Sequence, residues 1–365
     1  MTRPDRLTGF RRERHDGFAL LVDPLEESPA GFAQSVVRGL SDHPRWLHCR
    51  YLYDAEGSAI FERICEQPEY YQTRTEAALL AAHAADIRAL TGPATLVELG
   101  SGSSVKTHHL LRAWTANGAR AEYVPVDISR EMLRASCAAL ARAHPGLVVR
   151  GVAASYERAF PLLRDLSPLV LVFLGSTIGN FNPQELGGFL DRVSANLSPG
   201  DHVLLGIDLV KDVRTLEAAY NDAAGWSAAF TKNLFARMNR ELGQRLDLDA
   251  IEHVAYYDGI LDRIEIYGRF RREQTVAFPE LGRRFRIARG EMILTEISRK
   301  FEVDEMAACA ARAGLELVRP FVDATKAFAV LLLRMGDRRP VTAGREQAAG
   351  ACLAAVRART LELVE

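Results

Sequence analysis

Long apolar runs, a secretory leader and an excess of charge of either sign are all missing from this 365-residue sequence. No stretch reaches the ~18 uninterrupted apolar residues that a membrane-spanning helix needs. The first residues, MTRPDRLTGFRRER, contain no apolar segment of the kind that a secretory signal carries. We therefore expect a soluble protein of the cytoplasm.

Cysteine is scarce and dispersed. The five cysteines are Cys49, Cys65, Cys137, Cys309 and Cys352. An odd, scattered set without a CxxC pair argues against a disulfide scaffold and fits a reducing compartment. The histidines suggest no metal site either, because the adjacent His108 and His109 would face different directions on a helix. We expect no bound metal.

Positive and negative charges nearly cancel, with 46 Lys and Arg against 47 Asp and Glu. Nucleic acids and anionic membranes require a concentrated positive field, so neither is an expected partner. Local basic clusters at residues 11–14 and 269–272 are interpreted as solvated faces.

Strand-like apolar runs alternate with helical patterns in the middle of the chain. The runs are ATLVELG, EYVPVDIS, LVVRGVAA, PLVLVFLG and DHVLLGIDLV. Intervening helices of about 10–15 residues predict a parallel sheet with right-handed crossovers. Such sheets bind ligands at the carboxyl ends of their strands.

A second domain is predicted where this rhythm changes, near Asp212. A polar helical stretch there precedes the strand-like pieces EHVAYYDG, LDRIEIYGRF and EMILTEISRKF. We assign residues 75–210 and 301–337 to the sheet domain, and 15–74 and 211–300 to an α+β substrate domain. The last segment, 338–365, is predicted to be a helical tail.

The block LVELGSGSSVKT predicts a ligand-binding turn. Glu98 ends a strand, and Gly100 and Gly102 then turn the chain into a helix, so backbone amides can approach a carboxylate or phosphate. A dinucleotide fingerprint would need a third glycine where Val105 stands. A lone GxG is a weak signal, but this departure disfavours a nicotinamide cofactor.

Asp127 closes the next strand and could accept both ribose hydroxyls of a nucleoside. NAD enzymes use a similar acid, so Asp127 alone does not separate the two cofactor classes. The structural alternative is a helix cap in DISREM, for which Ser129 is the better candidate. Glu98 could likewise be a turn or capping residue. Two acidic strand ends in consecutive units favour a nucleoside ligand over a structural role for both.

Several long motifs resemble one family. They are YDAEGSAIFERICEQPEYYQTRTE, VELGSGSSVKT, FLGSTIGNF, NLFARMNREL and LTEISRKF. From about Arg45 to about Leu333, the chain resembles the histidine-specific methyltransferases that make hercynine, Nα-trimethylhistidine, in ergothioneine biosynthesis. The resemblance implies a Rossmann-like class I methyltransferase sheet with helices on both faces, plus the α+β substrate domain. It also implies S-adenosylmethionine, and L-histidine as the small-molecule substrate. We expect a monomer.

The resemblance assigns a first set of residues to S-adenosylmethionine. They are Tyr53, Gly100, Lys106, Asp127, Ser155 and Tyr156. Lys106, expected in the first turn of a helix, would pair with the methionine carboxylate against the unfavourable helix dipole. Ser155 stands where relatives often carry an acidic adenine contact. Tyr53 is our catalytic candidate, because its hydroxyl could orient the lone pair of the substrate amine.

A second set is assigned to the amino acid. It contains Tyr70, Gly175, Asn180, Tyr220, Ile266, Glu296 and Ser298. Asn180 and Tyr220 would grip the substrate carboxylate. Glu296 and Ser298 are two apart on a strand and face the same way, so they could satisfy the donor and the acceptor nitrogen of one imidazole. Ile266 replaces an expected methionine, which changes the shape of the pocket wall.

Each assignment has a structural alternative. Tyr53 and Tyr70 could be half-buried aromatics, Asn180 a turn residue and Glu296 a solvated strand position. Other functions stay open as well. They are Nα-methylation of tryptophan, tyrosine or a modified histidine, and non-catalytic sensing of S-adenosylmethionine or an amino acid.

Overall fold

The computed structural model describes residues 9–24 and 29–337, and these divide into two compact units. The first unit contains residues 9–24, 72–210 and 299–337; the second contains 29–71 and 211–298. The predicted helical tail, 338–365, lies outside the described residues. No helix in the described chain is long and apolar enough to span a membrane.

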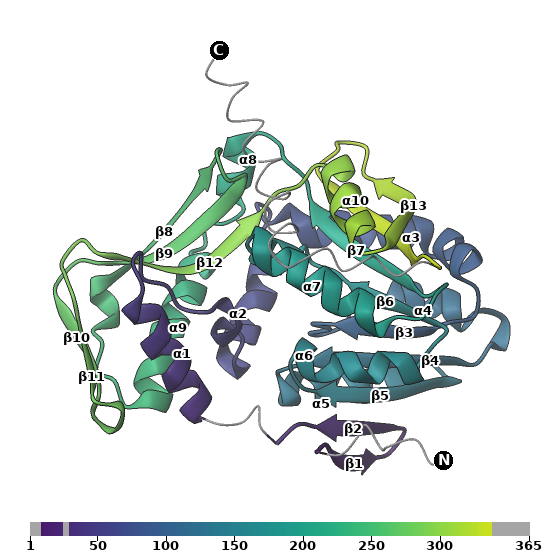
Figure 1. The fold of residues 1–365 in the computed structure, drawn as a ribbon, viewed down its shortest axis with the longest axis horizontal. Helices are drawn as coiled ribbons and strands as arrows, with labels where there is room; N and C mark the ends of the chain where they lie inside the picture. Colours follow the sequence, from purple (N-terminus) through teal and green to yellow (C-terminus); the bar gives the residue numbers. More distant parts are fainter. Residues whose placement is uncertain (1–8, 25–28, 338–365) are drawn as a thin grey trace. The chain divides into compact units, whose positions relative to one another are not determined.

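The first unit is built on a nine-stranded sheet with the order β1-β2-β5-β4-β3-β6-β7-β14-β13 (Figure 1). Its strands are β1 (Arg11–His15), β2 (Phe18–Val22), β3 (Thr95–Leu99), β4 (Ala121–Asp127), β5 (Leu147–Ala153), β6 (Leu169–Phe173), β7 (His202–Asp208), β13 (Leu315–Val322) and β14 (Phe328–Met335). Strands β2 to β7 pair in parallel, whereas β14 is antiparallel to β7 and β13. The predicted Rossmann-like parallel sheet is confirmed.

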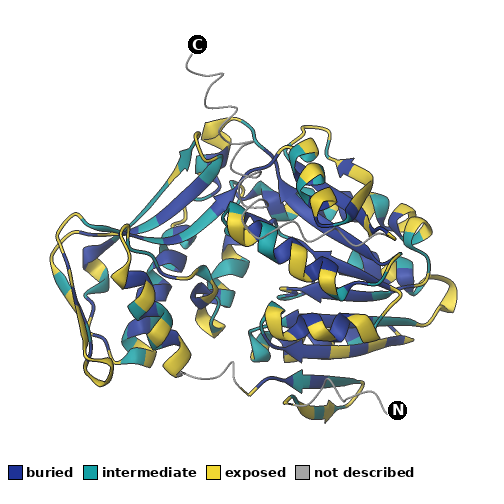
Figure 2. Cartoon of the chain, in the orientation of Figure 1, coloured by how far each residue is buried: buried dark blue, intermediate teal, exposed yellow. Residues whose placement is uncertain are grey.

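Helices cover both faces of this sheet. They are α3 (Tyr71–Thr91), α4 (His108–Trp114), α5 (Arg130–Ala143), α6 (Tyr156–Ala159), α7 (Pro183–Asn196) and α10 (Val303–Arg312), with the 3-10 turns η2 (Ala116–Gly118), η3 (Phe160–Asp165) and η4 (Thr177–Asn180). Alternate strand residues separate the two cores: Leu96 packs with α3, α4 and α5, whereas Val97 packs with α6, α7 and α10. Strands β6 and β7 are buried along their whole lengths (Figure 2).

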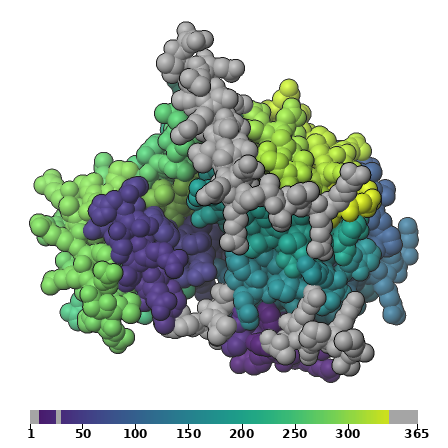
Figure 3. Space-filling view, in the orientation of Figure 1, coloured from purple at the N-terminus to yellow at the C-terminus, as the bar shows by residue number. Residues whose placement is uncertain are grey.

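The late segment 303–335 belongs to the same core as the middle of the chain. Met306 and Leu331, for example, pack with Phe189 and Leu205. In the space-filling view this yellow-green segment lies against the teal residues of the central sheet and its helices (Figure 3). The sheet is therefore completed by strands that come last among the described residues.

The second unit has its own core and two small sheets, β12-β9-β8 and β10-β11. Its elements are α1 (Pro29–Ser41), η1 (Cys49–Leu52), α2 (Ala55–Cys65), α8 (Val213–Ala218), α9 (Trp226–Leu242), η5 (Leu248–Ala250), β8 (Ile251–Asp258), β9 (Arg263–Phe270), β10 (Gln274–Phe278), η6 (Pro279–Leu281), β11 (Arg283–Ile287) and β12 (Met292–Arg299). The mixture of helices and strands has the predicted α+β character.

The structure corrects three details. Residues 15–24 belong to the first unit and not the second, because β2 pairs in parallel with β5. Helix α3 begins at Tyr71, four residues before residue 75, where the sheet domain was predicted to begin. Helix α4 begins at His108, so Lys106 lies in the preceding turn and not in the first helical turn. The two hairpins β1–β2 and β10–β11 were not predicted.

Candidate active site

The sheet of the first unit reverses its winding direction at β3. From β3 the chain adds β4 and β5 on one side and then returns to place β6 on the other side. Open α/β sheets bind ligands at the carboxyl ends of the strands at such a switch point. Here those ends lead into two turns, one with Gly100 and Gly102 and one with Gly175 and Asn180.

The turn after β3 requires glycine for two reasons. Gly100 and Gly102 have φ values of +67° and +49°, which disfavour residues with a Cβ. A Cβ on Gly100 would also lie 2.8 Å from Oη of Tyr156. The N–H of Gly100 donates to the carbonyl of Val126 at 2.8 Å, which ties the turn to β4.

Asp127, the last residue of β4, is oriented by two backbone amides. Its Oδ2 accepts from Gly102 N–H at 2.9 Å and its Oδ1 from Ser129 N–H at 2.8 Å. Burial raises the pKa of Asp127, and these amides oppose that rise. Ser129 is the cap residue of α5 but makes no side-chain cap bond. Ser129 is thus the cap residue that the sequence predicted, and each oxygen of Asp127 keeps a second lone pair for a hydroxyl donor.

Lys106 pairs with a residue that the sequence did not point to, Glu76 of α3. The Glu76 side chain is 0% exposed, and both its oxygens also lie 2.9 Å from the backbone nitrogen of Gly175. The helical spacing could have predicted its burial, because Glu76 precedes Leu79 and Leu80 by three and four residues and so lies on the buried face of α3. Its partners could not be read from that spacing.

Glu98 has a structural role within the described chain. Both of its oxygens lie 2.7 Å from the Thr107 hydroxyl, which shares its one hydrogen between them, and Glu98 also accepts from the Tyr123 hydroxyl. Burial raises the pKa of Glu98 to about 7, although both hydroxyl donors and Lys106 favour the charged form. Glu98 thus fastens the turn before α4 to the sheet.

Ser155 and Tyr156 follow the adjacent strand, β5. Ser155 is the cap residue of α6. The Tyr156 ring packs edge-on against Phe173 and Phe189, with centroid separations of 5.5 and 6.4 Å. The N–H of Ala154 donates to the carbonyl of Asp127 at 3.1 Å, so the ends of β4 and β5 are joined. A glycine turn, an oriented carboxylate, a lysine and an aromatic ring at one sheet edge fit a nucleoside with an amino-acid tail.

Aromatic rings in the second unit form a connected cluster. Tyr53 packs edge-on against Phe61 and Phe230, with ring centroids 5.6 and 5.2 Å apart. Phe61 continues to Tyr70 at 6.1 Å, and Tyr70 continues to Tyr220 at 6.2 Å. Burial raises the pKa of Tyr70 well above its ordinary value, and nearby Tyr220, Cys65, Tyr53 and Glu296 raise it further.

Tyr220 and Ser298 are directly joined, with Oη and Oγ 2.7 Å apart. Glu296 lies two residues earlier on β12 and therefore shares the face of Ser298. Ile266 lies on the neighbouring strand β9, is 4% exposed and packs with Tyr220. The structure thus brings together Tyr70, Tyr220, Ile266, Glu296 and Ser298.

His253 of β8 also supports this group and was not singled out from the sequence. Its Nε2 lies 2.9 Å from the carbonyl oxygen of Tyr220, and its Nδ1 lies 2.8 Å from the Thr231 hydroxyl. A carbonyl can only accept, so Nε2 carries the hydrogen and Nδ1 accepts from Thr231. Burial lowers the pKa of His253, which favours this neutral form.

The predicted residues therefore divide between the units. Those in the first unit are Gly100, Lys106, Asp127, Ser155, Tyr156, Gly175 and Asn180. Those in the second are Tyr53, Tyr70, Tyr220, Ile266, Glu296 and Ser298. The first set meets the needs of a nucleoside ligand, and the second combines aromatic walls with a carboxylate and hydroxyls.

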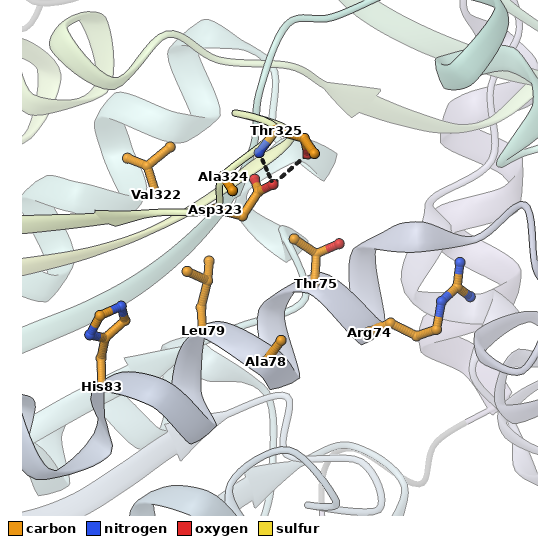
Figure 4. Close-up of a pocket in the computed structure, with 9 residues that line it drawn as sticks. All are labelled: Arg74, Thr75, Ala78, Leu79, His83, Val322, Asp323, Ala324 and Thr325. Atoms are coloured by element: carbon orange, nitrogen blue, oxygen red, sulfur yellow. Dashed lines mark hydrogen bonds between the residues drawn. The ribbon is translucent and has the colours of Figure 1, made fainter.

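A separate cavity of about 550 Å³ lies beside α3 and the β13–β14 turn (Figure 4). None of the predicted site residues lines it. Asp323, in its wall, accepts from the backbone N–H groups of Thr325, Ala327 and Phe328 at 2.6–2.8 Å and so closes the turn. Among the described residues, no group of three His, Cys, Asp or Glu side chains is placed to hold a metal.

Comparisons with known proteins identify the family. The family described as "Histidine-specific methyltransferase, SAM-dependent" matches residues 32–335. Histidine N-alpha-methyltransferases of Mycolicibacterium smegmatis and Mycobacterium tuberculosis are 41% and 38% identical, each over 82% of this chain and 93% of the relative. Ergothioneine biosynthesis protein 1 of Neurospora crassa is 32% identical over 56% of this chain and 24% of its own length. The chain therefore belongs to the S-adenosylmethionine-dependent, histidine-specific methyltransferases.

Proposed function

We propose that this methyltransferase transfers three methyl groups in succession to the α-amine of L-histidine, giving the trimethyl betaine hercynine for ergothioneine biosynthesis. The observation that carries the proposal is the Tyr220–Ser298 hydroxyl pair beside Glu296 on one face of β12. The histidine N-alpha-methyltransferases that match most of the chain support the same substrate.

Recognition of the ring follows from hydrogen-bond complementarity. A neutral imidazole has one donor and one acceptor nitrogen. Glu296 would accept from the ring N–H, and the hydroxyl pair would donate to the other nitrogen. Tyr70 and Ile266 would form apolar walls, and Asn180 would hold the substrate carboxylate. Tyr220, which the resemblance assigned to that carboxylate, is bonded to Ser298 and would act on the ring together with it.

S-adenosylmethionine supplies an already activated methyl group, so the chain has mainly to bind and orient. Gly100 and Gly102 would let backbone approach it, Asp127 would accept from the ribose, and Lys106 would pair with its carboxylate. Ser155 and Tyr156 would contact the adenine. Tyr53 would orient the lone pair of the neutral substrate amine, and water would take the released proton.

We infer further that the enzyme works as a monomer in the cytoplasm, without a nucleic-acid or membrane partner. A formal net charge of −1 supports the lack of a polyanionic partner. No two of the described cysteines are joined in a disulfide, which fits a reducing compartment.

Ile266 favours a second candidate, Nα-methylation of another aromatic amino acid. A branched, stiff side chain replaces the flexible methionine expected at this position, so the wall beside Tyr220 has a different shape. Tryptophan or tyrosine would give Glu296 a poorer partner than imidazole does, so histidine ranks first.

Mass spectrometry of products from purified enzyme, S-adenosylmethionine and each standard amino acid tests the choice. A gain of three methyl groups on histidine alone is expected. Methylation of a different amino acid would overturn the substrate assignment, and no methylation of any would favour a modified substrate or a sensor. Replacing S-adenosylmethionine with S-adenosylhomocysteine provides the control.

A further inference from the structure

Glu76 is a charged side chain with no exposed surface in the first unit. Its relative exposure is 0%, although it lies near the start of α3. A carboxylate removed from water is costly unless charges and hydrogen-bond donors compensate it. Glu76 has both, because it pairs with the Lys106 ammonium and accepts from the Gly175 N–H at 2.9 Å.

The two partners of Glu76 lie on different turns of the candidate site. Lys106 belongs to the turn between β3 and α4, and Gly175 to the turn after β6. Strands β3 and β6 are neighbours in the sheet, at the point where the winding direction reverses. One buried carboxylate thus joins the two turns that flank the switch point.

Strand β7 is adapted to admit this carboxylate. A Cβ on Gly206 would lie 2.0 Å from Oε1 of Glu76, so only glycine leaves enough space there. Gly175 itself has a φ of +75°, and a Cβ on it would come within 3.4 Å of Nζ of Lys106. The close approach of Glu76, Lys106 and Gly175 therefore depends on two positions that lack side chains.

We propose that Glu76 is a positioning residue for S-adenosylmethionine. It holds the Lys106 ammonium and the Gly175 amide at a fixed separation and thereby orients the methionine end of the ligand. An ammonium carries three donor hydrogens, so pairing with Glu76 is compatible with a ligand carboxylate on the same Lys106. The assignment of Lys106 to that carboxylate rests on the proposed function.

Binding of S-adenosylhomocysteine to the full-length protein, measured by calorimetry, tests the proposal without turnover. Glu76→Gln keeps the volume but removes the charge and one acceptor, and we expect at least about tenfold weaker binding. Lys106→Met should weaken binding similarly, and the double variant little further, because the two residues act as one unit. Asp86→Asn makes the same chemical change at an exposed position of α3 and should bind as wild type does.

Gly206→Ala provides an independent variant, because it displaces the Glu76 carboxylate while leaving Glu76 and Lys106 in the chain. Gly206→Ala should also weaken binding of S-adenosylhomocysteine. Circular dichroism should show that the Glu76→Gln and Gly206→Ala proteins are folded. A folded Glu76→Gln or Gly206→Ala protein with wild-type affinity would overturn the proposal, as would additive losses in the double variant. Wild-type enzyme that binds S-adenosylhomocysteine but leaves histidine unmethylated would instead contradict the proposed substrate.

Discussion

The hydroxyls of Tyr220 and Ser298 lie 2.7 Å apart and form one hydrogen bond. The pair has two hydrogens, and one of them occupies the bond between the oxygens. Only one hydrogen is left to donate to a third group, either from Tyr220 or from Ser298. The two residues should therefore serve the substrate as a unit.

Tyr220→Phe and Ser298→Ala should each raise the Kd for histidine by roughly tenfold, since each breaks the bonded pair that aims its one free hydrogen at the ligand. The Kd of the double variant should rise by much less than the product of the two single-variant increases. Titration calorimetry in the presence of S-adenosylhomocysteine measures these values. Tyr257→Phe is the matched control, because it removes a hydroxyl that is bonded to Asp262 at 2.7 Å. A Kd for the double variant that equals the product of the two single increases would argue against a shared hydrogen.

Glu296→Gln should reduce the preference for histidine over other aromatic amino acids. Glutamine keeps the size of the side chain but replaces a charged acceptor with a neutral amide, and hydrogen bonds to charged groups are the stronger ones. We expect kcat/KM for histidine to fall by about 10- to 100-fold, or about 1.4–2.8 kcal/mol. Glu252→Gln, on β8 and paired with Arg269, should leave it unchanged. Equal losses in the two variants would remove Glu296 from ring recognition.

Glu98 should make the folded protein less stable as the pH rises. Its pKa is about 7 in the fold, mainly because of burial, against an ordinary value of 4.5. Between these values the native state keeps a proton that the unfolded chain has lost. The stabilisation is therefore complete below about pH 4.5 and is lost as the pH rises through about 7.

Comparison with Glu98→Gln isolates this effect, because glutamine resembles the protonated acid at every pH. The difference in unfolding free energy between the two proteins should change by up to about 3 kcal/mol between pH 5 and pH 8, in favour of the glutamine variant. Urea denaturation at a series of pH values gives that difference. Parallel pH profiles for the two proteins would contradict the shifted pKa of Glu98.

His253 should have the opposite dependence. Burial lowers its pKa from the ordinary value of 6.5, so the fold favours the neutral ring that holds the Tyr220 carbonyl. This contribution is present above about pH 6.5 and is lost as the pH falls through the pKa in the fold. The melting temperature of His253→Gln should therefore fall less than that of wild type between pH 7.5 and pH 5.5. Melting temperatures that fall in parallel would show that folding does not lower the pKa of His253.

Local sequence determines the turn and the strand end that were predicted correctly around the candidate site. Gly100 and Gly102 follow a short apolar run, and only glycine readily takes the backbone conformation of that turn. Asp127 ends the next strand, as its sequence context predicts. The alternation of apolar strands with helices likewise predicted the parallel sheet, because buried parallel strands need continuous apolar segments.

Contacts between residues far apart in the sequence explain the features that the sequence did not predict. Glu76 meets partners that are 30 and 99 residues away in the chain, so the fate of its charge depends on the folded sheet. The strand Arg11–His15 is too charged to resemble a buried strand, and it forms at the sheet edge, where three of its five residues are exposed. Lys106 was placed in the helix because the glycine turn was taken as its start, whereas Thr107 is the cap residue.

The discontinuous second unit has a consequence during protein synthesis. Residues 29–71 are made first, but the rest of that unit, residues 211–298, follows only after 139 intervening residues. At ribosomal speeds of about 5–20 residues per second, the early segment waits roughly 7–28 s for its partners. The sheet also waits, because β14 inserts between β7 and β13 and is the last described strand to be translated, after 119 residues that follow the end of β7. The edge of β7 that pairs with β14 therefore stays without its partner strand on the nascent chain until residues 328–335 have been made.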